Sequence, residues 1–148
     1  MKTTLTTLLL FFGLSTQAFA CPDLTGVYVC GEDEVTIDTY ELSGVNYFEV
    51  NGQGRIPADG SWFQLPDSET EKNAKLSMTC GDKAPYGQHF VLNYQADMYD
   101  QGQYIALLDA QMYYFLDSDT FVQETTGTVK GSWGEQPIQS QKVVCTRK

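Results

Sequence analysis

The sequence predicts an all-β fold, a single antiparallel up-and-down barrel of about eight to nine strands. After residue 20 no helical periodicity is present, and short runs of alternating polarity rich in Val, Ile, Thr, Tyr and Phe recur instead. Gly, Asp, Asn and Pro separate these runs, as they do at turns. Because the open edges of so large a meander invite aggregation, the sheet must form a sandwich or close on itself, and a barrel is the simpler closure.

Nine runs have the composition of strands, in this order: 24–30, 35–42, 45–51, 56–65, 74–80, 88–96, 103–116, 120–126 and 138–146. The fourth run is interrupted by Pro57 and Gly60. Ser43-Gly44 has the two-residue length that favours a primed hairpin turn. Asp117-Ser118-Asp119 offers side chains that bond the backbone of their own turn.

Several runs show one apolar and one polar face, the pattern of an antiparallel sheet that is wet on one side. Alternation is clear in residues 35–38, 74–80 and 88–96. We expect an interior set that either fills the barrel or walls a ligand pocket. Its members are Tyr28, Leu76, Met78, Phe90, Leu92 and Tyr94.

Residues 1–20 are predicted to be a secretory signal peptide. Lys2 precedes an apolar run over 5–14, and Ala18-Phe19-Ala20 offers small residues at the two positions that signal peptidase reads. The apolar run is shorter than the ~20 residues that cross a bilayer, so we expect no stable membrane insertion. The mature chain is then residues 21–148, one barrel domain, expected to be a monomer.

The four cysteines predict two disulfides in an oxidising compartment, the periplasm or the exterior of a bacterium. A zinc site is disfavoured, because no Cys-x-x-Cys pair occurs and the sequence has one histidine. A lipid anchor on Cys21 is an alternative, but Phe19 fits a lipoprotein signal poorly and lipidation leaves an odd cysteine. We therefore favour an unlipidated protein cleaved after Ala20.

The disulfide pairing follows from the expected closure. In a closed antiparallel meander the first and last strands pair, so the start of the first lies beside the end of the last. This predicts bridges Cys21–Cys145 and Cys30–Cys80. A Cys21–Cys30 bridge requires residues 21–24 to fold back, since an extended run between them exceeds the ~7 Å Cα limit.

The chain is acidic, and loss of Lys2 with the signal peptide changes its formal net charge from −10 to −11. This charge disfavours binding to nucleic acid, which needs a basic footprint, and adhesion to anionic lipids. It permits a cationic partner, although scattered acidic residues also simply maintain solubility.

The first and last strands carry a resemblance to a known family. Leu24-Thr25-Gly26-Val27-Tyr28 and Arg147 resemble the lipocalin-like (calycin) pattern, in which Gly-x-Trp opens the first strand and an Arg or Lys of the last strand packs across the ring. Here Tyr28 stands where Trp is usual. The resemblance assigns a structural role to Gly26, Tyr28 and Arg147, and implies an internal cavity with apolar ligands.

No catalytic constellation is present, which predicts a protein that is not an enzyme and uses no cofactor or metal. His89 is expected to point to solvent, without a nucleophile beside it. Nothing in the spacing of the carboxylates selects a pair for glycosidase chemistry among Glu41, Glu49, Asp97 and Asp109. Asp117 to Asp119 and Asp67 to Glu71 are interpreted as turns rather than calcium ligands.

The leading functional prediction is an exported protein that binds a small apolar or amphipathic ligand inside the barrel. The alternative is an inhibitor of a cationic, envelope-directed hydrolase such as lysozyme, which would use the acidic surface. Tyr86, Tyr99 and Tyr104 lie in or beside loops and suit such a surface. An enzyme and a completely filled structural barrel stay open as further possibilities.

Overall fold

The computed structural model describes residues 21–148, and the predicted signal peptide lies outside these residues. The described chain consists of eleven strands joined by turns and short loops. Their bounds are β1 Gly26–Cys30, β2 Asp33–Leu42, β3 Val45–Val50, β4 Gln53–Pro57, β5 Phe63–Gln64, β6 Glu71–Lys83, β7 Gly87–Asp100, β8 Gln103–Asp117, β9 Thr120–Gly131, β10 Gly134–Pro137 and β11 Gln141–Arg147. Within residues 21–148 there is no helix long and apolar enough to cross a membrane.

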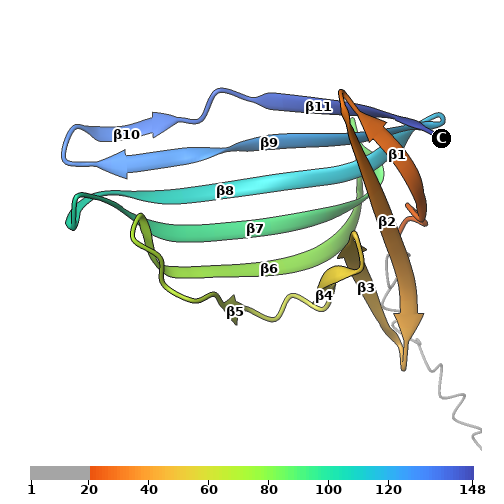
Figure 1. Ribbon diagram of the computed structural model, residues 1–148, viewed down its shortest axis with the longest axis horizontal. Helices are drawn as coiled ribbons and strands as arrows, with labels where there is room; N and C mark the ends of the chain where they lie inside the picture. The colour runs from red at the N-terminus through yellow and green to blue at the C-terminus, as the bar shows by residue number, and fades with distance from the viewer. Residues whose placement is uncertain (1–20) are drawn as a thin grey trace, which may run out of the picture.

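All strands belong to one antiparallel sheet with the order β4-β3-β2-β1-β11-β9-β8-β7-β6-β5, and β10 pairs with β9 beside this path. The predicted all-β antiparallel architecture is therefore confirmed. The first and last strands pair as expected, with Tyr28 opposite Arg147 and Val29 opposite Thr146. The sheet curls through 319°, so that β1 to β4 cross in front of the long strands β6 to β9 (Figure 1).

The sheet is an open half-barrel, and the prediction of a closed barrel of eight to nine strands is wrong. β4 and β6 come close at one end but do not pair. The predicted run 56–65 is not one strand, because β4 ends at Pro57 and the chain turns at Gly60 with a φ of +81°. The segment that follows β4 bridges the gap instead: Ala58 N donates to Asn46 O of β3 (2.7 Å), and Gly60 N donates to Met78 O of β6 (2.9 Å).

The half-barrel has two unlike ends because its strands differ in length. β6 to β9 contain 12 to 15 residues each, whereas β1, β3 and β4 contain five or six. The short strands cover one end of the long ones, and the hairpins β7–β8 and β9–β10 extend beyond them (Figure 1). Residues 127–137, predicted as a break, contain the end of β9 and all of β10.

The covered end holds the hydrophobic core. Tyr28, Phe48 and Phe90 are fully or almost fully buried there, together with Leu24, Ile37, Met78, Leu92, Phe121 and Cys145. The aromatic rings form a continuous cluster, with Phe48 at 5.4 Å from Phe90 and at 4.9 Å from Tyr114 between ring centroids. Pairs in this range stabilise a core beyond the apolar area they bury.

Two disulfides fasten this end, but their pairing corrects the prediction of Cys21–Cys145 and Cys30–Cys80. The bridges are Cys21–Cys80 and Cys30–Cys145. The register explains the difference: Tyr28 lies opposite Arg147, so Cys30, and not Cys21, comes beside Cys145, with 4.3 Å between Cα atoms. Cys21 precedes β1 and reaches β6 instead. Two disulfides are typical of an extracellular or periplasmic protein.

Candidate functional site

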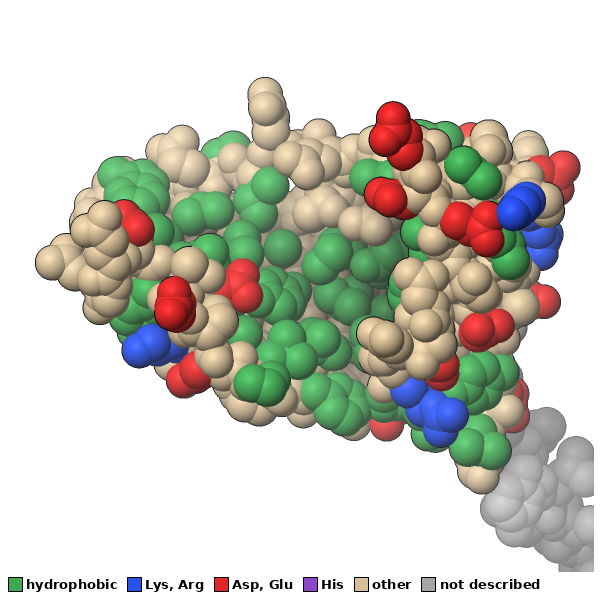
Figure 2. Space-filling view, viewed as in Figure 1, with side chains coloured by type: hydrophobic (Ala, Val, Ile, Leu, Met, Phe, Trp, Pro, Cys, Tyr) green, Lys and Arg blue, Asp and Glu red, His purple; other side chains and the backbone are tan. Residues whose placement is uncertain are grey.

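The concave face of β6 to β9 continues from the packed core into a trough that no strand covers. Strand register puts one set of side chains on this face at the uncovered end: Leu76, Tyr94, Met98, Leu108, Met112 and Val129. All six remain partly exposed although they sit in the middle of the sheet. Figure 2 shows the result as a hollow with a hydrophobic floor and acidic side chains along its rim.

Small residues lower the floor of the trough between these larger side chains. Ala110 pairs with Tyr94 on one side and with Gly127 on the other, and Ala106 pairs with Met98 and Gly131 in the same way. Ala106 and Ala110 are nevertheless almost fully covered, at 1% and 5% exposed, so the larger side chains around them close over these positions.

Two tyrosine hydroxyls lie beside this apolar surface, and the register also places Gln123 and Thr125 on the same face, opposite Tyr114 and Met112. Tyr94 donates a hydrogen bond from its hydroxyl to Oε2 of Glu71 at 3.0 Å. Burial, together with this carboxylate, raises the pKa of Tyr94 from 10.0 to about 12. Burial alone raises the pKa of Tyr114, at the packed end of the trough, to about 12 as well. Both hydroxyls are therefore neutral hydrogen-bonding groups at physiological pH.

The open end of the trough carries an exposed tryptophan. Trp133, in the β9–β10 turn, is 57% exposed, and its ring lies where a side chain at Gly131 would stand, 2.6 Å from that Cβ position. Gly131 belongs to the trough face, since it pairs with Ala106. Trp133 thus extends the apolar surface to the mouth, where amphipathic indole rings suit a boundary between apolar and wet surroundings.

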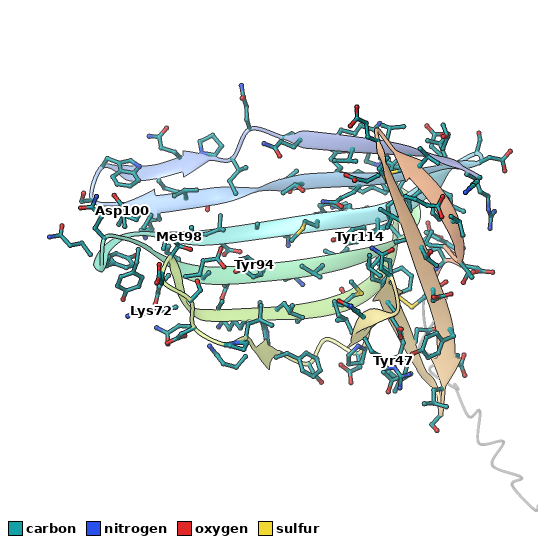
Figure 3. All side chains as sticks on the ribbon, viewed as in Figure 1. Tyr47, Lys72, Tyr94, Met98, Asp100 and Tyr114 are labelled. Atoms are coloured by element: carbon teal, nitrogen blue, oxygen red, sulfur yellow. A yellow bond between two sulfur atoms is a disulfide. The ribbon has the colours of Figure 1, made fainter. Side chains whose placement is uncertain are left out.

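An open cleft of about 810 Å³ lies at this end of the molecule, between the loop that precedes β6 and the β7–β8 turn, and its walls include none of the six trough residues. Its walls are Asp67, Ser68, Glu69, Thr70, Lys72, Asp100, Gln101 and Gly102. Figure 3 shows Asp100 and Lys72 at this end of the molecule, with Met98 and Tyr94 further along the trough and Tyr114 near the packed end.

The six residues predicted to line a ligand pocket divide between the two ends. Tyr28, Met78 and Phe90 have no exposed area, and Leu92 is 7% exposed, so these four fill the packed core. Leu76 and Tyr94 lie on the wall of the trough. Met98, Leu108, Met112 and Val129 were missed, although alternation over 106–114 places Ala106, Leu108, Ala110, Met112 and Tyr114 on one face.

The contact suggested by the family resemblance is present at the packed end. The Arg147 guanidinium lies 5.9 Å from the centroid of the Tyr28 ring, and an added Cβ on Gly26 would stand 3.1 Å from Nε of Arg147. The Tyr28 hydroxyl donates to Leu24 O at 2.8 Å. The contact of Arg147 with Tyr28 holds β1 against β11, and the three residues of the family pattern, Gly26, Tyr28 and Arg147, meet at one point of the fold.

His89 faces the convex side of the sheet, as the alternation predicts, but the expectation that it is solvent-exposed is wrong. It is 3% exposed. Its pairing partner Gly81 has no side chain, so the imidazole lies flat over β6, and the ring of Tyr86 covers it at 5.6 Å. Nδ1 donates to Gly87 O at 2.6 Å, which gives the ring a structural partner.

The tyrosines suggested for a recognition surface mostly have intramolecular partners. Tyr86 stacks on Tyr113 at 4.5 Å. Tyr99 contacts Tyr104 edge to face at 5.8 Å, and of the three proposed residues Tyr104 alone is strongly exposed, at 53%.

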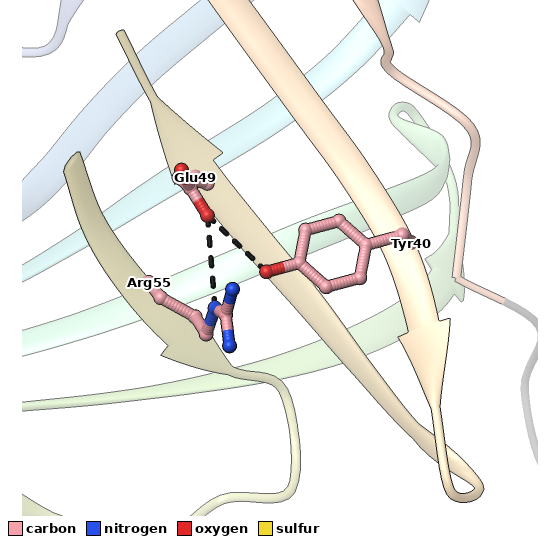
Figure 4. A network of polar contacts seen from close by, with 3 residues as sticks. All are labelled: Tyr40, Glu49 and Arg55. Carbon is pink, nitrogen blue, oxygen red and sulfur yellow. Dashed lines mark hydrogen bonds and ion pairs between the residues drawn. The ribbon is translucent and has the colours of Figure 1, made fainter. Parts of the chain in front are cut away.

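The candidate carboxylates do not converge on one site. Asp97 accepts a hydrogen bond from Asn73 and Asp109 accepts one from Gln95, both on the convex face. Glu49 belongs to a network on the outside of β2 to β4, where it accepts from the Tyr40 hydroxyl at 3.2 Å and lies 3.7 Å from Nε of Arg55 (Figure 4). Glu41 has no contact with this network. Among residues 21–148, no group of three or more His, Cys, Asp or Glu side chains could hold a metal ion.

The network in Figure 4 links β2, β3 and β4, the three strands that we call the closing arm of the half-barrel. Beside it, the Tyr40 and Tyr47 rings stack with 5.6 Å between centroids, and the Arg55 guanidinium lies 5.5 Å from the Tyr40 ring and 5.8 Å from the Tyr47 ring. Three strands are thereby linked on the face opposite the core. This arm keeps Phe48 pressed against Phe90 and so fixes where the trough begins.

Comparisons with known proteins identify no relative from which a function could be inferred, so the proposed function starts from the trough. No protein-family model matches the chain, and neither the curated proteins nor the solved structures contain a match.

Proposed function

We propose that this protein binds a small apolar or amphipathic molecule whose apolar part lies in the trough of the half-barrel. The proposal keeps the ligand class that the lipocalin-like resemblance implies and moves the binding surface from a closed interior to the uncovered concave face. It is a binding function and requires no catalytic group.

One observation carries the proposal: the alternation of side chains continues unchanged where no strand covers the sheet. Met98, Leu108 and Val129 are apolar on the trough face, whereas their neighbours Asp97 and Asp109 on the convex face are polar. A contiguous, partly exposed apolar surface inside a concave wall is the usual form of a small-molecule site.

The test is the binding of an uncharged solvatochromic dye such as Nile red to the oxidised protein. We expect saturable binding with a blue-shifted emission, little dependence on salt, and a rise in melting temperature at saturating dye by mass action. Leu108→Glu places a charge on the floor of the trough and is expected to weaken binding by about tenfold or more.

The matched control is Leu107→Glu, the adjacent residue on the convex face of the same strand. Both leucines are partly exposed, so the two variants carry the same chemical change and similar destabilisation. Equal loss of dye binding in the two variants, or no saturable binding by the folded wild-type protein, would refute the proposal.

A further inference from the structure

We propose that the trough selects an uncharged amphiphile whose polar group is an oxygen acceptor, such as a ketone, an ester or an alcohol. This polar group lies at the packed end of the trough, beside Tyr114, Gln123 and Thr125, and the apolar chain extends from there toward the open end. The inference rests on the proposed function, and it adds the chemistry of the polar group and the residues that recognise it.

The Tyr114 hydroxyl is a hydrogen-bond donor that faces the trough. Its ring belongs to the packed end, with 4.9 Å between its centroid and that of Phe48 and 6.1 Å to that of Phe121. The hydroxyl reaches back along β8 and donates to Sδ of Met112 at 3.6 Å. Since Met112 is one of the six trough residues, this hydroxyl lies at the boundary between the core and the uncovered surface.

The present acceptor of this hydroxyl is a weak one. A thioether sulfur accepts hydrogen bonds poorly, and a buried hydroxyl gains more from an oxygen acceptor. Burial also raises the pKa of Tyr114 to about 12, so the hydroxyl keeps its proton and remains a donor at physiological pH. The oxygen of a ligand in the trough would replace the sulfur as its acceptor.

Two further polar side chains share this part of the concave face. Gln123 lies opposite Tyr114 across the β8–β9 pair, and Thr125 lies opposite Met112. Residues directly opposite in an antiparallel pair have Cβ atoms ~4.5–5.5 Å apart, so the three polar side chains are neighbours. Gln123 and Thr125 are half-buried, and within residues 21–148 neither side chain makes a hydrogen bond. An amide and a hydroxyl can each donate to a ligand oxygen.

The surroundings of these donors select a polar group without charge. The neighbouring strands place apolar residues on the same face, with Leu92 of β7 opposite Met112 and Val143 of β11 opposite Gln123. A carboxylate or an ammonium group among these side chains would lose hydration without gaining an ionic partner. A neutral oxygen loses less hydration and finds the donors that it needs.

The rest of the trough suits an apolar chain. Because the rings around Tyr114 close the packed end, the chain of a ligand bonded there must extend toward the open end. From Met112 to Leu108 the floor follows four residues of β8, about 13 Å, which matches an extended chain of about ten carbons. Further along the wall, the Tyr94 hydroxyl already donates to Glu71 at 3.0 Å, which leaves Tyr114 as the tyrosine whose hydroxyl lacks an oxygen acceptor.

The experiment measures displacement of Nile red by three amphiphiles that share a chain of ten carbons: 2-decanone, decanoate and decyltrimethylammonium. Each is used below its micelle concentration and at about 0.5 M salt, which screens the acidic surface so that long-range attraction of the cation does not decide the order. We expect 2-decanone to bind about tenfold more tightly than either charged compound, because its oxygen accepts hydrogen bonds without the loss of an ionic hydration shell.

A matched pair of double variants locates the effect. Tyr114→Phe with Thr125→Val removes two hydroxyls from the concave face and keeps the shape of both side chains. It is expected to weaken binding of 2-decanone by about fivefold to tenfold and to change the affinities of the charged compounds by less than about twofold. Tyr113→Phe with Thr126→Val makes the same two changes at the adjacent, equally half-buried residues of the convex face, and is expected to leave all three affinities unchanged.

The outcomes separate this inference from the proposed function. If none of the three compounds displaces the dye from the wild-type protein, the trough does not hold an apolar chain and the proposed function fails. If a charged compound binds as tightly as 2-decanone, or if the two double variants bind 2-decanone equally well, the trough binds apolar chains and the assignment of a neutral polar group beside Tyr114 is wrong.

Discussion

Replacement of Gly127 by alanine is expected to be among the most destabilising single changes in this protein. β9 changes partner at this residue, pairing with β11 up to Thr125 and with β10 from Thr128, and Ile138 N donates to Gly127 O at 2.8 Å. Gly127 has a φ of +151°, and an added Cβ would stand 2.2 Å from the carbonyl oxygen of Asp109. That oxygen is backbone, so no rotamer change relieves the clash.

Two contributions set the expected loss in the free energy of unfolding. A non-glycine residue in this region of φ costs about 1–3 kcal/mol. Moving β8 away from β9 to admit the methyl group also loses one or two backbone hydrogen bonds, at about 1 kcal/mol each. The sum, about 3–5 kcal/mol, corresponds to a melting temperature lower by roughly 10–20 °C for a domain of this size.

The assay is urea unfolding of the oxidised protein followed by circular dichroism, with Gly102→Ala as the control. Gly102 also has a positive φ, +79°, but nothing lies within 4 Å of its Cβ position, so that only the backbone term of about 1–2 kcal/mol applies. If the free energies of unfolding of the two variants differ by less than about 1 kcal/mol, the close contact of β8 and β9 is not the reason that position 127 requires glycine.

Three further outcomes are expected. Peptide mapping without reduction should recover the disulfides Cys21–Cys80 and Cys30–Cys145, and a Cys21–Cys145 peptide would overturn the register of β1 on β11. The double variant Cys30→Ser with Cys145→Ser should have a free energy of unfolding lower by about 2–5 kcal/mol. Phe48→Ala should cost about 3–5 kcal/mol in urea unfolding, because its ring joins Phe90 to Tyr114, and a loss below 1 kcal/mol would mean that the closing arm does not pack on the long strands. Because the folded-state pKa values of Tyr94 and Tyr114 are raised to about 12, the folded state binds more protons than the unfolded chain between pH 10 and 12. The free energy of unfolding should therefore be unaffected below pH 10 and fall as pH rises through this window, less steeply in Tyr114→Phe than in the wild type. An identical fall in wild type and variant would contradict burial of the Tyr114 hydroxyl.

The local sequence pattern predicted strands well in the middle of the sheet, where a strand pairs with a neighbour along each edge. Residues 88–96 alternate clearly, and β7 places Phe90, Leu92 and Tyr94 on one face as expected. The pairing of the first strand with the last was predicted because the unpaired edges of a long meander invite aggregation. The contact of Arg147 with Tyr28 followed from the family resemblance, with a tyrosine in place of the usual tryptophan.

The errors come from tertiary geometry that no local pattern contains. The extension of β7 to Asp100 and of β9 to Gly131 depends on pairing with the neighbouring strand rather than on local propensity. Closure failed at β4, where Pro57 and Gly60 leave no strand of useful length to meet β6. The disulfide pairing required the register of β1 to within two residues, and His89 is buried because Gly81 and Tyr86 make room for it and cover it.

The trough itself could be covered by a second copy of the chain, and this possibility gives a separate expectation. An apolar face that exists for self-association would be buried in a dimer, and dye binding would then compete with dimer formation. The acidic rim opposes this arrangement, because two copies meeting mouth to mouth would bring Asp67, Glu69 and Asp100 of both chains together. We therefore expect sedimentation at low and high salt to give a monomer, with the same result for Leu108→Glu. If the wild-type protein is a dimer that high salt strengthens and Leu108→Glu dissociates, the trough is an interface between copies, and the apolar alternation at its uncovered end has that explanation instead.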